Sequence, residues 1–354
     1  MSGQPFEPDK LRRFAVGALG ALGVPGDEAG MVADVLLDAD LSGAATHGIL
    51  RLPLYADRVR RGTMTAVARI ETLSDRPAVA HLDAGFALGP VAAVRAMAVA
   101  EEKAVAGGVG LVLMRRASHF GTAGYHARCA TSRGLIGIVA SNTAAMLVPP
   151  GGKRAAVGNS PLAIALPDGA GGTAFTTDLA FSTTSLGRIL LARAEGRPIP
   201  PDWALEASGL PTTDPSAALS AGLLLAMGGG KGFALALAIE ALTGLLAGAG
   251  FGPSLPSIYR HPDQTQDLGQ LFLAVDPYVF LSHSEFSSRI AALRAAVHGA
   301  ANADGPALRL PGDRGAAARQ VADRIILPAT VVAELAVLAS AVGIAPPEPE
   351  KAPA

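Results

Sequence analysis

The chain has 354 residues, more than one ordinary hydrophobic core uses, so we expect two domains or one large α/β unit. Only 17% of the residues are charged and 50% are hydrophobic, which excludes an extensively disordered protein. The net charge of −1 excludes a nucleic-acid-binding protein that depends on a basic surface. The single cysteine, Cys129, excludes an internal disulfide and a thiolate zinc cluster. Together with a polar N-terminus that lacks a signal-peptide core, it predicts a cytoplasmic protein.

Apolar residues at helical spacing mark the start of the chain, where we expect helices over residues 9–22, 25–40 and roughly 50–61. The spacing then changes to short strand-like runs at 70–73 and 78–82, followed by an alanine-rich helix at 89–106. Further on, apolar runs typical of buried strands lie at 109–114, 135–141, 160–166 and 174–178. Helical patterns separate some of these runs, at 123–133 and 183–195.

The last third of the chain follows a loop rich in proline and threonine at 196–215. We expect helices at 232–250, 284–298 and 328–342, and one strand at 270–275. The first of these helices is strongly apolar, but Lys231 precedes it and Glu240 lies near its middle. A central carboxylate is costly inside a bilayer, so we expect a buried helix and no contact with a membrane.

This order of elements predicts an α/β (α+β) protein with two domains. An α/β sheet domain over about 75–225 is inserted in a mainly helical domain made from 1–74 and 226–345. The proline-rich residues 346–354 are expected to be a disordered tail.

A cluster of reactive side chains lies near residue 50. His47, Arg51 and Tyr55 are spaced i, i+4 and i+8, so on a helix they would share one face. A proton-transfer group beside a guanidinium that can bind a carboxylate suits chemistry on a small organic acid. Pro53 is tolerated only near a helix start, so we expect the helix to begin within 48–52. A capped surface helix with an unrelated histidine is the alternative.

Polar residues follow three of the predicted strands, where ligands of open α/β sheets usually bind. His119 follows the first, the run 141–143 ends the second, and Asp178 ends the third. A purely structural histidine is the alternative for His119. Lys231 lies in a glycine-rich loop at a helix start, where an anion is stabilised, although a plain glycine-rich turn explains the same residues.

Several common site motifs are missing from the sequence. No Gly-x-Gly-x-x-Gly follows a strand, no Walker loop surrounds Lys231, and the histidines have no metal-ligand spacing, so we expect no metal. The residues by themselves therefore predict an α/β enzyme for a small anionic substrate, with an anionic cofactor.

Four short motifs together resemble the malate/L-lactate dehydrogenase superfamily, typified by sulfolactate dehydrogenase, ureidoglycolate dehydrogenase and diketogulonate reductase. These motifs are Thr46-His47-Gly48, Ser118-His119-Phe120-Gly121, Gly158-Asn159-Ser160-Pro161 and the turn at 211–215. The resemblance spans nearly the whole chain and implies a non-Rossmann, NAD(P)-dependent oxidoreductase. It also implies a homodimer with a small carboxylate substrate and with neither nucleic acid nor membrane as a partner.

The resemblance implies roles for individual residues. Thr46 and His47 carry the active-site hydroxyl and imidazole, and His119 is the alternative acid/base, with Asp178 completing the catalytic set. Arg51, with Asn159 and Tyr55, is implied to contact the substrate. The cofactor is implied to bind along His119, Phe120, Gly121, Thr122, Ala123, Thr143, Thr177, Asp178, Leu179, Lys231, Pro311, Gly312 and Asp313.

The chain also departs from the family pattern. Gly230 stands where many members have histidine, and Asp313 replaces a usual glutamate. Leu186 and Arg188 occupy positions that hold a histidine and an acid in the branch that reduces cyclic imino acids. We therefore expect an oxidoreductase of 2-hydroxy and 2-oxo acids, with NAD or NADP as cofactor. An imino-acid reductase and a non-catalytic ligand-binding protein are the alternatives.

Overall fold

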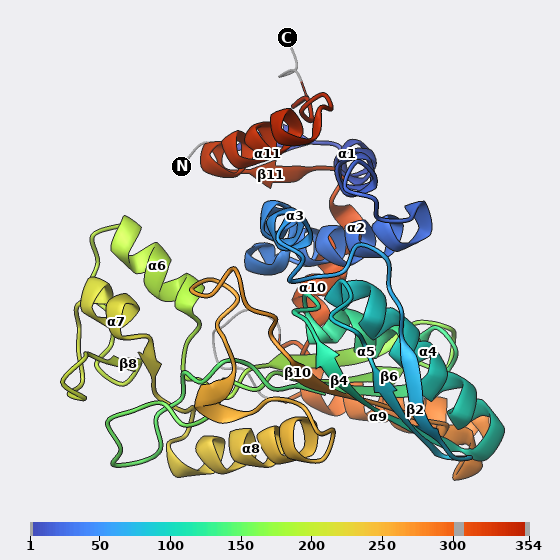
Figure 1. Cartoon of the computed structure of the whole chain (residues 1–354). Helices are drawn as coiled ribbons and strands as arrows, with labels where there is room; N and C mark the ends of the chain where they lie inside the picture. Colours follow the sequence, from blue (N-terminus) through green and yellow to red (C-terminus); the bar gives the residue numbers. More distant parts are fainter. Residues whose placement is uncertain (1–2, 301–307, 351–354) are drawn as a thin grey trace.

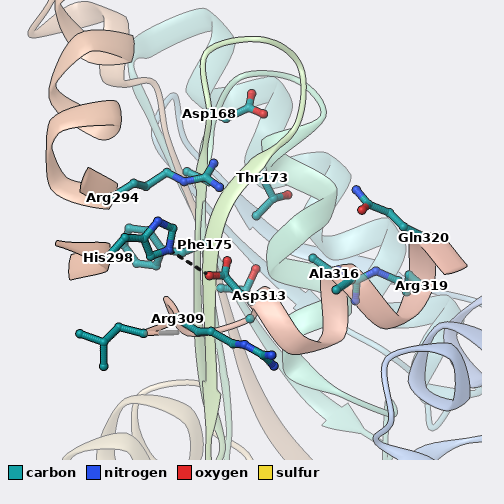
Figure 2. Close-up of a pocket in the computed structure, with 15 residues that line it drawn as sticks. Asp168, Thr173, Phe175, Arg294, His298, Arg309, Asp313, Ala316, Arg319 and Gln320 are labelled. Atoms are coloured by element: carbon teal, nitrogen blue, oxygen red, sulfur yellow. Dashed lines mark ion pairs between the residues drawn. The ribbon is translucent and has the colours of Figure 1, made fainter. Parts of the chain in front are cut away.

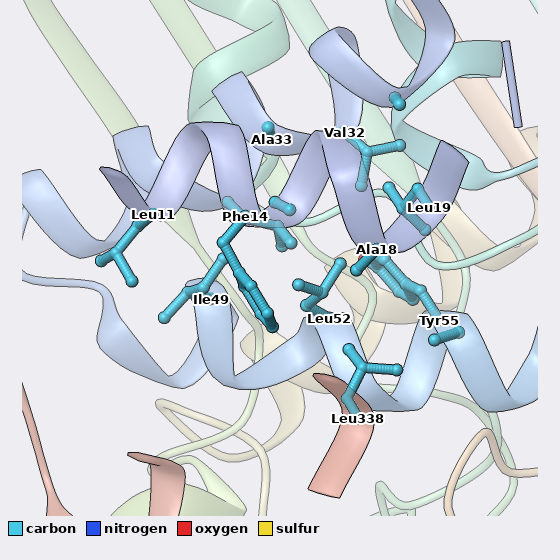
Figure 3. Close-up of a cluster of buried hydrophobic side chains, with 14 of the residues drawn as sticks. Leu11, Phe14, Ala18, Leu19, Val32, Ala33, Ile49, Leu52, Tyr55 and Leu338 are labelled. Atoms are coloured by element: carbon cyan, nitrogen blue, oxygen red, sulfur yellow. The ribbon is translucent and has the colours of Figure 1, made fainter. Parts of the chain in front are cut away.

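The computed structural model describes residues 3–300 and 308–350 (Figure 1). One layer consists of helices packed around an apolar core that Figure 3 shows in detail. Its elements are α1 (Pro8–Gly20), α2 (Gly26–Leu41), the short turns η1 (Ala45–His47) and η2 (Ile49–Arg51), α3 (Leu52–Arg60) and α11 (Ala329–Val342). The antiparallel pair β1 (Gln4–Phe6) and β11 (Ile325–Leu327) joins the two ends of the chain to this layer.

The second layer is a seven-stranded sheet with the order β2-β3-β4-β10-β5-β6-β7. Its strands are β2 (Glu71–Asp75), β3 (Val79–Asp83), β4 (Val109–Ala117), β5 (Ile136–Ser141), β6 (Leu162–Pro167), β7 (Thr173–Leu179) and β10 (Leu268–Val275). Because β10 is antiparallel to both β4 and β5, and β6 is antiparallel to both β5 and β7, the strands β4, β5 and β7 run in one direction. Their carboxyl ends therefore lie along a single edge of the sheet, which faces the polar residues predicted from the sequence.

Helices cover both faces of the sheet. Small residues of α4 (Gly89–Gly107) and α5 (Ala123–Thr131) pack on one face in a core built largely from alanine. Figure 1 shows α8 (Gly230–Glu240) and α9 (His283–His298) below the sheet, opposite α5. The π-helical turn η3 (Ala241–Leu245) continues α8 and contacts β10 and β4. No helix in the described part of the chain is long and apolar enough to cross a membrane.

A third group of elements has its own small core and lies to one side of the sheet in Figure 1. It contains α6 (Leu186–Ala194), β8 (Ala204–Leu205), α7 (Pro215–Ala221) and β9 (Leu223–Leu224). The remaining elements are η4 (Gly252–Ser254), η5 (Pro277–Val279) and α10 (Asp313–Val321).

The predicted helices and strands are present, but the helix expected to be buried at 232–250 leaves Leu235 and Leu237 half exposed, because only one of its faces packs on the protein. The division into domains also differs from the expectation. The strand expected at 270–275 is β10, and it lies in the middle of the sheet, although the sequence assigned 226–345 to the helical domain. The helix α9 likewise packs its buried residues against Phe175 of β7. Local sequence patterns carry no information about such long-range strand pairing, so this part of the predicted division is wrong.

The expected disordered tail is also partly ordered. Glu350 donates its main-chain N–H to the carbonyl oxygen of Pro5 at 2.8 Å, and its carboxylate lies 2.8 Å from Arg324 Nε. Residues 346–350 are therefore bound to the chain ends, while residues 351–354 lie outside the described part of the chain.

Candidate active site at the edge of the sheet

The turn that carries His47 is fixed by a carboxylate from α2. The N–H of Ile49 donates to Asp40 Oδ2 at 2.7 Å, and a Cβ on Gly48 would lie only 2.0 Å from Asp40 Oδ1. Only glycine therefore fits at position 48 with the carboxylate in this place. Burial raises the pKa of Asp40 to about 7. The α-helix α3 starts at Leu52, within the predicted range, and His47 and Arg51 lie on the 3-10 turns before it.

Arg51 is held with its guanidinium close to the histidine turn. Its Nε donates to the carbonyl oxygen of Thr46 at 2.7 Å, and its Cζ lies 5.0 Å from the ring centroid of Tyr259. Arg51 takes part in none of the ion pairs found among residues 3–300 and 308–350. Its two terminal nitrogens keep the fork geometry that suits a carboxylate.

His47 and His119 come from distant parts of the chain and stack on each other. Their ring centroids are 5.7 Å apart with an interplanar angle of 14°. Thr46 Oγ1 lies 3.1 Å from His47 Nδ1. Burial, together with the charge of Arg51, lowers the pKa of His47 to about 4. Burial, together with the neighbouring His47 and Arg51, holds the pKa of His119 well below its ordinary value. Both imidazoles are therefore neutral at pH 7.

The backbone of His119 is held from three sides. Its N–H donates to Gln266 Oε1 at 3.2 Å, and Gln270 Nε2 donates to the carbonyl oxygen of Ser118 at 3.0 Å. On the third side, a Cβ on Gly89 would lie 2.1 Å from the carbonyl oxygen of His119, so glycine allows α4 to approach the strand end. The following residues, Phe120 to Ala123, lead directly into α5, as the sequence predicted.

Tyr55 is fully buried in the helical layer, with 0% of its side chain exposed. Its hydroxyl oxygen lies 2.7 Å from His119 Nδ1. Because the side chain has no accessible surface, its predicted contact with substrate is wrong. Tyr55 contacts the site through His119 instead, because α3 turns this residue toward the core.

The next two strand ends bring Thr143 and Asn159 together. Thr143 Oγ1 donates to Asn159 Oδ1 at 2.9 Å and accepts from the N–H of Asn159 at 3.1 Å. A Cβ on Gly158 would lie 2.2 Å from Thr143 Oγ1, so the glycine of this motif is required for the contact. The two residues are therefore locked as one unit at the same edge of the sheet as His119.

Asp178 at the end of β7 holds the start of α5. Its Oδ2 accepts the N–H of Gly124 at 2.8 Å, and the surrounding protein desolvates the carboxyl group enough to raise its pKa. Within the described residues it makes no hydrogen bond to His47 or His119. Its contacts explain a role in ordering the segment between 119 and 124, whereas its catalytic role stays a prediction.

The segments implied to bind the cofactor also meet at β7. The N–H of Thr176 donates to the carbonyl oxygen of Pro311 at 3.0 Å, and a Cβ on Gly312 would lie 2.9 Å from Thr176 N. Asp313 Oδ2 accepts the N–H of Leu310 at 2.8 Å, which closes the turn before α10. Thr177 and Leu179 continue along the same strand.

A pocket of about 540 Å³ opens between β7, α9 and α10 (Figure 2). Arg294 and Arg309 reach into it above and below Asp313 in this view, and His298 Nε2 lies 3.5 Å from Asp313 Oδ2. A volume in this range suits a small-molecule ligand. The pocket and the turn at 310–313 thus fit one end of an anionic cofactor.

Lys231 lies apart from these contacts, on the exposed first turn of α8. The loop before it pairs with the residues after β7, since the N–H of Met227 donates to the carbonyl oxygen of Phe181 at 2.9 Å. This pairing puts the lysine on the same side of β7 as its carboxyl end. No group of three or more potential metal ligands occurs in the described chain.

Sequence reasoning missed the loop before β10, which supplies Tyr259 and Gln266 to the site. Arg58 of α3 anchors this loop by donating to the carbonyl oxygens of Gln264 at 2.7 Å and of Ile258. Thr63 Oγ1 donates to the carbonyl oxygen of Pro262 at 3.2 Å. No local motif marks such a loop, although a fully buried arginine signals that main-chain carbonyls must surround it.

The chain is similar to several known proteins over most of its length. Residues 6–336 match the family model described as malate/L-lactate dehydrogenase. The (2R)-3-sulfolactate dehydrogenase (NADP(+)) of Chromohalobacter salexigens is 37% identical over 325 residues, covering 91% of this chain and 94% of that protein. The ureidoglycolate dehydrogenase (NAD(+)) of Escherichia coli is 34% identical over 282 residues, covering 80% of each. The solved sulfolactate dehydrogenase of Methanocaldococcus jannaschii superposes with a TM-score of 0.90 at 32% identity, covering 96% of this chain and 98% of that one.

Proposed function

Since the chain belongs to the malate/L-lactate dehydrogenase family, whose members are NAD(P)-dependent oxidoreductases, we propose that it interconverts a small 2-hydroxy acid and its 2-oxo acid. A nicotinamide, when bound, would supply or accept the hydride at substrate C2. The observation that carries the proposal is the Arg51 guanidinium, held beside two stacked neutral histidines with no carboxylate of the described chain as its partner. A substrate carboxylate would complete this arrangement.

Within this arrangement each side chain has a distinct task. Arg51 binds and orients the substrate carboxylate, and its fixed Nε leaves the terminal nitrogens for that contact. His47 takes the proton from the substrate hydroxyl in oxidation and returns it in reduction, while Thr46 orients its ring. A bound carboxylate offsets the charge of Arg51, which is one cause of the low pKa of His47. Substrate binding therefore makes His47 a stronger base when a base is needed.

We further propose that the substrate carries a second anionic group. The first turn of α6 borders the site, because a Cβ on Gly187 would lie 2.9 Å from Thr46 Cγ2. The exposed Arg188 belongs to that turn. Relatives named for sulfolactate and for malate act on acids with such a second group. A cyclic imino acid lacks it, which favours the hydroxy-acid reading.

A panel of 2-oxo acids with and without a distal carboxylate or sulfonate, assayed by the oxidation of NADH and NADPH, tests this function. We expect turnover with the doubly anionic acids and little with Δ1-imino acids. Turnover restricted to imino acids would replace the proposed substrate class. Dinucleotide binding without turnover of any member would support a ligand-binding protein.

The pocket beside β7 supports a preference for NADP. Arg294 and Arg309 line it, and neither belongs to an ion pair among the described residues, so a ribose phosphate would find two unpaired cations there. Replacing both by alanine is expected to raise KM for NADPH about 10-fold or more and to leave KM for NADH nearly unchanged. An equal change for both cofactors would contradict the preference.

We also propose that the protein is a homodimer. Large apolar side chains are exposed along α8, η3 and the residue after them, among them Leu237 at 50%, Leu245 at 56% and Leu246 at 62%. Several large exposed apolar side chains on one segment are typical of a surface that another protein covers. Light scattering at micromolar concentration is expected to give twice the mass of the 35.6 kDa chain. A mass near that of one chain would refute the proposal.

A further inference from the structure

The contact between Tyr55 and His119 determines which ring nitrogen of the histidine carries the proton. His119 Nδ1 lies 2.7 Å from the Tyr55 hydroxyl oxygen and 3.5 Å from the N–H of Gly121, which points at it. A main-chain N–H is always a donor, but at 3.5 Å the N–H of Gly121 favours Nδ1 as an acceptor only weakly. The tyrosine hydroxyl completes a pair of donors on the same nitrogen.

Tyr55 itself acts as a donor because its phenol stays protonated. Burial raises the pKa of the fully buried hydroxyl, and the opposing effect of the Arg51 charge is smaller. Of the groups that face His119, Arg51 carries a charge, whereas His47 and the amide of Gln266 are neutral. No carboxylate of the described chain is hydrogen-bonded to the ring, so nothing there favours an imidazolium.

We propose that Tyr55 is a positioning residue that fixes His119 as the neutral tautomer with its proton on Nε2. The inference rests on the proposed function in one respect: it gives His119 a task on the substrate. With Nε2–H facing the site, His119 donates a hydrogen bond to the substrate oxygen and has no lone pair there to accept a proton. His47 is then the one acid/base of the pair, and the two stacked rings have separate tasks.

A purely structural role for Tyr55 makes a different prediction. The ring packs in the helical core with Leu52 and Ala18, and Tyr55→Phe preserves that packing (Figure 3). If the hydroxyl only filled space, its removal would leave the tautomer of His119 unchanged. Tyr125→Phe is a matched control, because the Tyr125 ring lies 5.3 Å from the buried His126 in a different part of the sheet domain.

Nitrogen-15 NMR of histidine-labelled protein without substrate or cofactor reads the tautomer directly, and His119→Gln assigns the signal. We expect Nε2–H alone in the wild type and in the control Tyr125→Phe, and a mixture with Nδ1–H in Tyr55→Phe. A wild-type signal from Nδ1–H, or an unchanged tautomer in Tyr55→Phe, would overturn the inference. The spectrum is independent of turnover, so it can fail while the proposed function stands.

Kinetics give the second measurement. Tyr55→Phe is expected to lower kcat about 3- to 30-fold, because a misplaced proton weakens one hydrogen bond to the reacting oxygen. KM for the acid should change less than 2-fold, since Arg51 is untouched. A rise in KM with an unaltered kcat would assign Tyr55 to substrate binding and contradict the positioning role.

Discussion

The two ends of the site are built in different ways. At the substrate end, Arg51 Nε donates to the carbonyl oxygen of Thr46, and His119 Nδ1 lies beside the hydroxyl of the buried Tyr55. Asp40 holds the turn after His47 by accepting the N–H of Ile49. At the proposed cofactor end, Lys231 and Arg309 are exposed, one at a helix start and one in a loop that lines the pocket. The difference indicates that the reacting groups are positioned in advance, whereas the cations proposed for the cofactor are less constrained by the protein.

Removing either histidine tests the rigid end and should have the largest effect. Loss of a general acid/base costs about 10²–10⁴-fold in rate. We expect His47→Ala to lose more kcat than His119→Ala, because only His47 moves the proton. His119→Ala should also weaken dinucleotide binding, as its motif leads into the cofactor segment. Stopped-flow kinetics and dinucleotide titration measure the two effects, and an unchanged dinucleotide affinity in His119→Ala would remove that residue from the cofactor site.

Arg51→Met removes the charged fork while keeping a chain of similar length. The loss of a charge-assisted bidentate bond should cost about 2–4 kcal/mol in kcat/KM, roughly 30- to 1,000-fold. Arg60→Met, at the exposed end of α3, is the control and should leave kcat/KM unchanged. Near-wild-type kcat/KM in Arg51→Met for the best acid substrate would show that the carboxylate binds elsewhere.

Lys231→Ala tests the open end. If the lysine contacts a cofactor phosphate, the substitution should weaken the binding free energy of the dinucleotide by about 1.5–3 kcal/mol. This corresponds to a rise in Kd of roughly 10- to 150-fold. The penalty should shrink at high salt, because screening weakens the ion pair in the wild type. Lys10→Ala, whose ammonium pairs with Glu7 far from β7, serves as the control. If Lys231→Ala binds NADH and NADPH with the same isotherms as the wild type, the lysine only keeps the start of α8 soluble.

His126 should have the smallest effect on turnover, although it affects stability. Burial lowers its pKa from 6.5 to about 4, so between these values the unfolded chain binds a proton that the folded chain does not. The free energy of unfolding therefore falls as the pH drops from 6.5 toward 4, by up to about 3 kcal/mol for this residue. In His126→Gln, urea unfolding at several pH values should show a shallower acid limb. The same slope as in the wild type would contradict the shift.

Local signals in the sequence predicted the helices and the strand ends well. His119 and Asp178 were found because a polar residue directly follows an apolar run, and parallel strands bring such residues to one edge. The position of β10 between β4 and β5 could not be found, because pairing over more than 100 residues leaves no local trace. Tyr55 was assigned to the substrate because its spacing from His47 and Arg51 would put all three on one face of a regular helix. The segment starts with 3-10 turns instead, so the spacing does not give the direction of each side chain.

The buried Arg58 has a consequence for how the substrate range can change. Its guanidinium binds main-chain carbonyl oxygens at both ends of the loop from Ile258 to Gln264, and carbonyl oxygens are the same for every residue type. The contact of Arg58 with the loop therefore does not depend on which side chains these two positions carry. Positions such as Tyr259, directly over Arg51, are free to mutate while the clamp persists. Substitutions confined to Tyr259 would therefore sample new substrate side chains while Arg58 keeps the loop in place.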